Sequence, residues 1–283
     1  MKVAIIGSGI CGLACAMELE RNGVIPVIFE RDATPGWVWP SVTIWPDVFY
    51  NTYGDIKKHL LRQYKIDFYV IGKINRITMK SANEKVTIEG DLGYSVARGN
   101  QPRALENQLH RQLNQTAIYF ASKEDYKNLS KRYDYIVVAS GRDSEAREMG
   151  LWEDEGIVYI VEGHANGSFT SGTAEIYFNT DYAGTGYGRI TPFSPSAAVV
   201  GLYIIGKDEL DSLKYFRDFI RKENLDKYDY VLRSVPAPFT TGRAKRFSAG
   251  NVLLAGRAAG LTERVLGCSF TDKVGHILKK VQN

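Results

Sequence analysis

The opening thirty or so residues constrain the fold of this chain more than any other part. Lys2 to Ile6 is a short apolar run rich in β-branched residues, and it leads into Gly7-Ser8-Gly9-Ile10-Cys11-Gly12, a G-x-G-x-x-G pattern. Apolar residues then recur at near-helical spacing up to Asn22-Gly23, which is a helix-ending signal. Ile25 to Phe29 is a second apolar run, and it ends at Glu30. The pattern predicts a strand, a helix and a second strand, the first unit of a parallel α/β sheet.

The three glycines of this pattern suit the binding of a dinucleotide. Gly7 permits a tight turn, Gly9 lets a pyrophosphate approach the main chain, and Gly12 lets the helix pack closely on the strand. The start of the helix supplies main-chain N–H groups and a partial positive charge. Glu30 is placed to accept both ribose hydroxyls, and its charge disfavours a 2′-phosphate. A purely structural glycine turn is the alternative, but the ordered strand, helix, strand and acid favour a nucleotide site. Its predicted residues are Gly7, Ser8, Gly9, Ile10, Cys11, Gly12, Glu30 and the neighbouring Arg31.

The remaining chain alternates between parallel α/β segments and segments with a period of two. Helices are predicted from Asp55 to Tyr64, from Pro102 through Leu113, from Leu210 to Arg221 and from Phe270 to Val281, and buried strands at 117–120, 135–138 and 252–255. Antiparallel strands are predicted between Asp67 and Val96 and between Ile157 and Ile205. We therefore expect an α/β fold in which a Rossmann-like dinucleotide-binding domain (residues 1–66, 97–150 and 241–283) carries an inserted antiparallel β-sheet substrate domain (residues 67–96 and 151–240).

Composition narrows the classes of partner and compartment. The chain has 36 Lys and Arg against 32 Asp and Glu, a net charge of +4, without a basic run of five, so we expect no nucleic-acid partner. The three cysteines show no pairing pattern, the four histidines lack zinc spacing, and the N-terminal apolar run leads into the glycine motif rather than a signal-peptide cleavage site. We expect a cytoplasmic protein without a metal site, in which Cys11 and Cys15 are packing residues.

Two segments resemble FAD-dependent oxidoreductases. Gly12 to Arg31 resembles the opening of the glutathione-reductase type, and Gly250 to Gly260 resembles the flavin motif of the hydroxybenzoate-hydroxylase-like superfamily in its geranylgeranyl-reductase-like branch. The resemblance implies that FAD is the cofactor and that a turn running from Gly256 contacts the flavin and its ribityl chain. It assigns that contact to Gly256, Arg257, Gly267, Cys268 and Ser269.

Further matches lie between these two segments, and together they extend from residue 1 to about residue 275, which indicates a minimal version of the fold. Val137 to Ser144 resembles the A-[DTS]-G segment of the same superfamily, which implies that Ser140 and Gly141 lie beside the pyrophosphate. Arg98 and Arg103 resemble the arginine-bearing crossing from strand to helix that contacts FAD.

A last match concerns the substrate side. Gly186-Tyr187-Gly188, followed by Pro192-Phe193, is similar to the reductase-branch stretch that lines the face opposite the flavin. Tyr187 is therefore a candidate proton donor. Cys268 is a second candidate, because a helix start lowers the pKa of a thiol. Two roles are open for the tryptophans Trp37, Trp39 and Trp45. They either form an aromatic lid, which would suit an apolar substrate or contact with a membrane surface, or cover the join between the two domains.

Two departures from the family pattern leave alternatives open. Arg257 stands where the family has an aspartate, and a guanidinium donates hydrogen bonds but accepts none. Ser140 stands where many hydroxylases have an aspartate. The resemblance implies a FAD-dependent reductase or dehydrogenase of a small apolar organic substrate, with NADH or NADPH as a transient electron donor. The alternatives are a non-catalytic or degenerate FAD- or NAD-binding protein and an enzyme that uses NAD in the first site. The sequence leaves the oligomeric state open.

Overall fold

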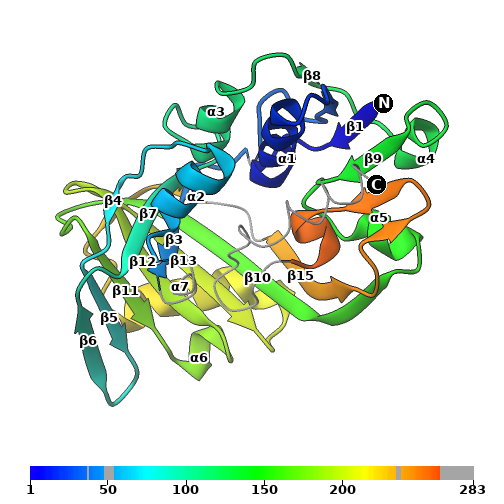
Figure 1. Ribbon diagram of the computed structural model, residues 1–283. Coiled ribbons are helices and arrows are strands. Elements are labelled where there is room, and N and C mark those ends of the chain that lie inside the picture. The colour runs from blue at the N-terminus through cyan, green and yellow to red at the C-terminus, as the bar shows by residue number, and fades with distance from the viewer. Residues whose placement is uncertain (37, 48–53, 234–236, 262–283) are drawn as a thin grey trace.

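The computed structural model describes residues 1–36, 38–47, 54–233 and 237–261, whose strands form three sheets of six, eight and three strands (Figure 1). Each sheet includes neighbouring strands that come from distant parts of the chain. The predicted fold class, a parallel Rossmann-type sheet combined with antiparallel sheet, is confirmed.

The six-stranded sheet has the order β16-β17-β9-β1-β2-β8, and all its strands except β16 run parallel. Apolar β-branched runs in the middle of this sheet are buried because helices cover both faces. The prediction that residues 117–120 form a buried strand is wrong for burial, because strand β8 lies at the edge of the sheet and is largely exposed. Helix α1 packs on one face, and the short helices α4, α5 and η4 pack on the other. The elements are β1 (Val3–Ile6), α1 (Ile10–Arg21), β2 (Val27–Phe29), β8 (Ala117–Tyr119), α4 (Tyr126–Leu129), β9 (Tyr135–Val138), α5 (Ser144–Glu148), β16 (Ser248–Ala249), β17 (Val252–Leu254) and η4 (Gly256–Ala259).

The eight-stranded sheet lies below the parallel sheet in Figure 1, and helices α6 and α7 cover its lower face. Its order is β14-β10-β13-β12-β11-β5-β6, with β15 also paired to β10, and only the β11–β5 pair is parallel among the described strands. The elements are β5 (Arg76–Lys80), β6 (Lys85–Glu89), β10 (Trp152–Asn166), β11 (Thr173–Tyr177), α6 (Thr180–Ala183), β12 (Tyr187–Ser194), β13 (Ala197–Ile205), η3 (Glu209–Asp211), α7 (Ser212–Lys222), β14 (Asp229–Arg233) and β15 (Ala237–Ala244).

A small third sheet joins the other two. Its strands are β3 (Ser41–Pro46), β4 (Gly72–Lys73) and β7 (Gly93–Arg98), in the order β3-β7-β4. Strand β3 was not expected, because the Trp- and Pro-rich segment before it reads as a loop. Helix α2 (Ile56–Tyr64) follows as predicted, and the Asp55 carboxylate caps it by accepting a hydrogen bond from the main-chain N–H of Lys58 at 3.0 Å.

Two element boundaries predicted from the sequence are wrong. Helix α3 spans only Leu105–His110, because Gln101 and the residues after it form a turn that is closed by a hydrogen bond from the Ala104 N–H to the Gln101 carbonyl (2.9 Å). Antiparallel strands are predicted between Asp67 and Val96, with the first running from Asp67 to Lys80; that first strand is divided into β4 and β5, and residues 66–70 are irregular. The helix predicted from residue 270 to 281 lies outside the described residues.

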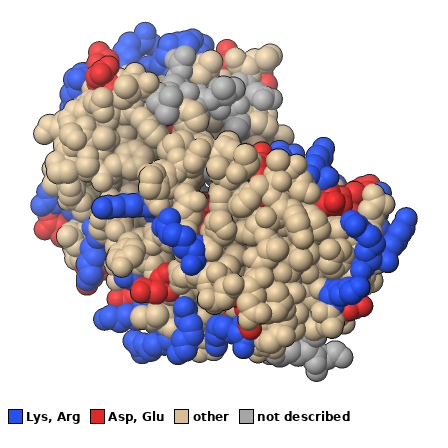
Figure 2. Space-filling model, turned by 90° about the horizontal axis from the view of Figure 1, so that it is seen from above, with Lys and Arg blue, Asp and Glu red and all other residues tan. Residues whose placement is uncertain are grey.

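The distribution of charge and the character of the helices describe the molecule as a whole. Basic and acidic side chains are interspersed over the face shown in Figure 2, and neither sign covers it. In the part of the chain that the structure describes, no helix combines the length and the apolar character needed to span a membrane.

Candidate functional site

The glycine loop joins β1 to α1, and its glycines differ in what surrounds them. A Cβ on Gly7, whose φ is +97°, would lie 2.6 Å from the Ala139 carbonyl oxygen, and a Cβ on Gly12 would lie 2.0 Å from the Gly7 carbonyl oxygen. Gly9 has an ordinary φ of −70°, and a Cβ there would meet no atom within 4 Å. The packing of the protein therefore requires glycine at Gly7 and Gly12 but not at Gly9. The absence of a side chain at Gly9 keeps open a space beside the start of α1.

The start of α1 also lacks a side-chain cap. Gly9 is its N-cap residue, so no side-chain hydrogen bond caps the helix, and its first turn carries no acidic residue. The main-chain N–H groups of a helix start have no partner within the helix, and they carry partial positive charge. The arrangement suits an anion.

Glu30 follows β2 at the same edge of the sheet and is 5% exposed. Its Oε2 accepts hydrogen bonds from the Ser8 main-chain N–H (2.7 Å) and the Ser8 hydroxyl (2.9 Å), and its Oε1 accepts one from the Asp32 N–H (2.9 Å). A carboxylate has about four acceptor positions, so one remains on Oε1. Glu30 thus shapes the glycine loop and retains room for one ribose hydroxyl. The second hydroxyl requires the Ser8 hydroxyl to turn away. Arg31 is exposed beside it and pairs with Asp32.

The end of β9 brings Ser140 and Gly141 against the loop. The Cβ position of Gly7 lies 3.0 Å from the Ser140 Cα, and the Ser140 hydroxyl donates to the Glu145 carboxylate at 3.1 Å. Gly141 has a φ of +70° and open space at its Cβ position. The structure therefore places this predicted segment next to the glycine loop.

The end of β17 also lies against the glycine loop and the start of α1. A Cβ on Gly256 would lie 2.9 Å from the Cβ of Cys11, so η4 begins against the first turn of α1. Segments that are almost 250 residues apart in the sequence thus form one site. The predicted residues Gly267, Cys268 and Ser269 lie outside the described residues.

Arg257, the departure from the family pattern, is partly buried beside this junction. Its Cζ atom lies 3.5 Å from the centroid of the Phe239 ring on β15, a cation–π contact. Burial lowers the pKa of Arg257 to about 10, although the negative charge of Asp143 raises it. The guanidinium therefore stays charged at neutral pH. Its stacking on Phe239 leaves a partly desolvated positive charge on the residue that follows Gly256.

The two arginines of the strand-to-helix crossing have different surroundings. Arg98, at the end of β7, donates from Nε to Oε1 of the fully buried Glu106 at 2.8 Å. The other oxygen of that carboxylate is buried and has no hydrogen-bond partner among the described residues. Arg103 lies in the turn before α3 with its side chain exposed. Of the two arginines, Arg98 is the one held by a buried carboxylate, although its own side chain is partly exposed.

Cys11 and Cys15 face the packed side of α1. Burial raises the pKa of the Cys11 thiol to about 12, and burial followed by the charges of Cys11 and Glu18 raises the pKa of Cys15 further. Both thiols are protonated at neutral pH, which agrees with their predicted role as packing residues. The described residues contain no cluster of three or more His, Cys, Asp or Glu that is arranged to bind a metal ion.

A buried polar cluster lies on the upper face of the eight-stranded sheet, opposite α7. Alternation along β10, β12 and β13 places Glu162, Arg189 and Tyr203 on this face. Arg189 Nη2 is 3.6 Å from Glu162 Oε1, to which the Tyr203 hydroxyl donates at 3.1 Å, and the Ser41 hydroxyl donates to Glu162 Oε2 at 2.9 Å. Arg189 also donates to the Val42 carbonyl oxygen at 2.9 Å. The cluster therefore fastens β3 to the sheet. Charged residues inside otherwise apolar strands were the available sequence signal for it.

The predicted proton donor Tyr187 belongs to this face as well. Its ring is 2% exposed and stacks on Tyr203, with ring centroids 4.7 Å apart. The tryptophans contribute to the join between the sheets: Trp39 makes an edge contact with His164 of β10, and the buried Trp45 makes one with Phe68. These contacts favour the covering role over the lid for Trp39 and Trp45. Trp37 lies outside the described residues.

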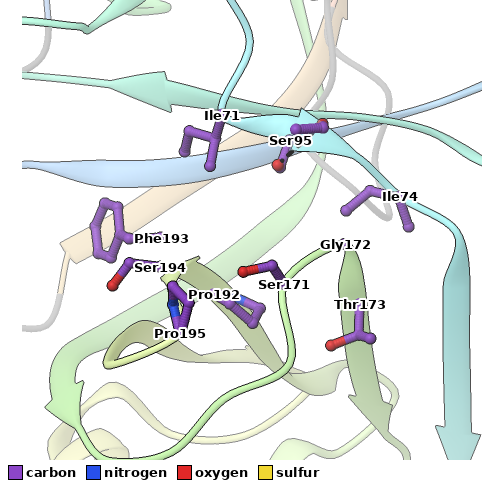
Figure 3. Close-up of a pocket in the computed structure, with 11 residues that line it drawn as sticks. Ile71, Ile74, Ser95, Ser171, Gly172, Thr173, Pro192, Phe193, Ser194 and Pro195 are labelled. Atoms are coloured by element: carbon purple, nitrogen blue, oxygen red, sulfur yellow. Dashed lines mark hydrogen bonds between the residues drawn. The ribbon is translucent and has the colours of Figure 1, made fainter.

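A pocket of about 180 Å³ lies between the three-stranded and eight-stranded sheets. The side chains of Ile71 and Ile74 lie on one side of it and those of Pro192, Phe193 and Pro195 on the other (Figure 3). Hydroxyl groups of Ser95, Ser171, Thr173 and Ser194 complete the lining. It contains no charged side chain, so its chemistry suits a small and mainly apolar molecule.

A comparison with known proteins supports the fold. A family model described as an NAD(P)-binding Rossmann-like domain matches residues 5–55, and no curated protein matches the chain. A solved structure from Thermoplasma acidophilum, described as geranylgeranyl bacteriochlorophyll reductase-like, covers 99% of this chain with a TM-score of 0.74, at 14% sequence identity and over 77% of its own length. The two chains share one fold.

Flavin-dependent proteins also have this fold. The flavin-dependent halogenase CmlS covers 93% of this chain with a TM-score of 0.64 and 18% identity, over 54% of its own length. Aklavinone-11 hydroxylase, solved with FAD and aklavinone, covers 91% with a TM-score of 0.57 and 15% identity, over 57% of its own length. The predicted resemblance to FAD-dependent oxidoreductases is therefore confirmed for the fold.

Proposed function

We propose that the chain is a FAD-dependent oxidoreductase that acts on a small organic substrate. The observation that carries the proposal is the open space at Gly9. The protein's own packing accounts for Gly7 and Gly12, whereas at Gly9 a side chain would meet nothing in the protein. A glycine that the packing of the protein does not require, at a helix start without a side-chain cap, is explained by a ligand that approaches the main chain there.

The surrounding residues fit the parts of FAD. The start of α1 would bind the pyrophosphate, the free acceptor position of Glu30 would hold a ribose hydroxyl, and Gly141 leaves the main chain open to the same ligand. The charge of Arg257 would complement the phosphates. Bound FAD supplies electron transfer to or from the substrate, and the chain supplies binding, orientation and the exclusion of water.

Different residues support the proposal for the substrate. The pocket of Figure 3 has an apolar lining with hydroxyl groups, which supports the expectation of a small, mainly apolar substrate. Tyr187 remains the proposed proton donor, although its burial against Tyr203 requires the substrate to reach the inner face of the sheet. We propose NADH or NADPH as the transient electron donor.

A second candidate is a nucleotide-binding protein that uses NAD in the glycine loop. The family model that matches residues 5–55 is described as NAD(P)-binding, and this observation favours it. The replacement of an acceptor by Arg257 is the feature that would accompany loss of turnover, so a non-catalytic protein belongs to the same alternative.

Spectroscopy and anaerobic reduction distinguish these functions. A FAD-dependent oxidoreductase is expected to absorb near about 450 nm after purification or reconstitution with FAD, to release FAD on acid treatment, and to lose that absorbance when NADH or NADPH is added without oxygen. Flavin that binds but is reduced by neither nucleotide nor by any candidate substrate would support the non-catalytic alternative. Binding of NAD without flavin would overturn the proposal.

A further inference from the structure

Strand β6 forms one edge of the eight-stranded sheet, and no described strand pairs with its outer side. It is the last strand in the sheet order, and the β5–β6 hairpin projects from the body of the molecule (Figure 1). All of its residues are exposed, including Val86 at 53% and Ile88 at 44%. An exposed strand edge presents main-chain donors and acceptors to another strand.

The pairing of β6 with β5 shows which groups face outward. The Ser81 N–H donates to the Glu84 carbonyl oxygen at 2.8 Å, and the Gly90 N–H donates to the Asn75 carbonyl oxygen at 3.0 Å, so hydrogen-bonded pairs stand at both ends of the hairpin. Such pairs alternate along an antiparallel ladder. The register Met79↔Val86 and Ile77↔Ile88 makes these the other hydrogen-bonded pairs. The main-chain groups of Lys85, Thr87 and Glu89 therefore point away from β5.

The sequence of this strand, Lys85-Val86-Thr87-Ile88-Glu89, is complementary to its own reverse. When two copies run antiparallel about Thr87, Lys85 lies opposite Glu89 of the partner subunit, and Val86 lies opposite Ile88 of the partner subunit. Thr87 then lies opposite its own copy. In this register every outward-facing residue forms a hydrogen-bonded pair, and opposite charges meet at both ends.

We propose that two copies of this chain associate through antiparallel pairing of their β6 strands, centred on Thr87. Charge supports a second copy as the occupant. Among the described residues Lys85 has no ion pair, and Lys80, directly opposite it on β5, pairs with Glu175. Glu89 pairs with Arg76 of β5 through Oε1, which leaves Oε2 to face Lys85 of the partner subunit. A lysine on a strand edge ordinarily deters pairing, and here the partner's Glu89 neutralises it. The proposal does not depend on the bound nucleotide.

The dimer is expected to be weak. A strand of five residues buries far less than the roughly 1,600 Å² of a standard interface. We therefore expect the fraction of dimer to rise with protein concentration in the micromolar range. Sedimentation velocity of the full chain, from about 1 to about 200 µM, should show a monomer that converts to a dimer.

Variants at three positions test the register. Thr87→Pro removes an outward N–H that β5 does not use, so the hairpin should remain and the dimer should be lost. Thr87→Ala keeps the main-chain donor and is the matched control, with dimerisation close to that of the native chain. Lys85→Glu should weaken association by about tenfold, because like charges then face each other at both ends, and adding Glu89→Lys should restore it.

Two results would overturn the proposal. One is a native chain that stays monomeric over the whole concentration range. The other is a dimer that persists in Thr87→Pro and is unaffected by the single charge reversal, since such a dimer would use another surface. Circular dichroism of each variant confirms that the sheet is retained, and rescue by the double charge reversal separates pairing from a folding defect.

Discussion

Alanine substitutions at Gly9 and Gly12 should separate the two roles of glycine: Gly9→Ala should impair FAD binding with little change in stability, and Gly12→Ala should impair stability. At Gly9 the added Cβ meets no atom within 4 Å and φ is −70°, so the fold accommodates it. Loss of a favourable N-cap residue costs about 0.5–1 kcal/mol, and the reduced freedom of the unfolded chain returns about 0.4–1 kcal/mol. The free energy of unfolding of Gly9→Ala should therefore stay within about 1 kcal/mol of the native value.

At Gly12 the same methyl group would lie 2.0 Å from the Gly7 carbonyl oxygen. That atom belongs to the main chain and cannot turn aside as a side chain does. Helix α1 must move away from β1, and overpacking of this kind costs about 3 kcal/mol or more. Gly12→Ala should be clearly destabilised, whether or not a nucleotide is present.

Urea denaturation of both variants without FAD measures the free energy of unfolding, and calorimetric titration with FAD measures the affinity. The methyl group of Gly9→Ala stands where the pyrophosphate is expected, so its FAD affinity should fall by at least about tenfold, or 1.4 kcal/mol. Unaltered FAD affinity in Gly9→Ala would refute the assignment of the open space to a ligand. A loss of stability as large as that of Gly12→Ala would refute the packing argument itself.

Three further substitutions test neighbouring groups. Glu30→Gln should lower FAD affinity about tenfold in calorimetric titration, because a neutral acceptor replaces a charged one, and an unchanged affinity would mean that Glu30 does not hold the ribose. Arg257→Asp should weaken FAD binding by up to about tenfold, since a cation is lost and an anion is placed near Asp143; tighter binding would instead mark Arg257 as a lesion in a decaying site. Burial raises the pKa of Glu20, but hydrogen bonds from the Thr116 side chain and from three main-chain N–H groups outweigh it, so the pKa lies below its ordinary value. Glu20→Gln should therefore be about 1 kcal/mol less stable than the native chain at neutral pH, and urea titrations should show the difference vanishing as the pH falls through the lowered pKa; a difference that persists in acid would contradict this.

Local patterns predicted the parallel part of the fold well. Strands β1, β2, β9 and β17 coincide with short apolar runs, because strands buried on both faces need apolar residues at nearly every position. Strand β8 also lies at a predicted run, but it is an edge strand and is largely exposed. The adjacency of the glycine loop, Glu30 and the end of β9 follows from the rule that parallel strands end at one edge of the sheet. The same rule brings Gly256 to Cys11.

The missed features depend on long-range contacts. Strand β3 follows a segment whose tryptophans and prolines indicate a loop, and it becomes a strand through pairing with β7 and through the hydrogen bond from Arg189 to the Val42 carbonyl oxygen. The contact of Glu162 with Arg189 links two strands of one sheet, β10 and β12, and both residues bind β3; no local stretch of sequence contains these partners. The stacking of Arg257 on Phe239 likewise joins η4 to β15.

Titration of the native apoprotein with FAD, with NAD⁺ as competitor, tests the central claim most directly. We expect each chain to bind one FAD. Excess NAD⁺ or NADP⁺ should not displace it, and Gly9→Ala should weaken its binding. Absence of FAD binding, or occupation of the glycine loop by NAD⁺ in preference to FAD, would contradict it.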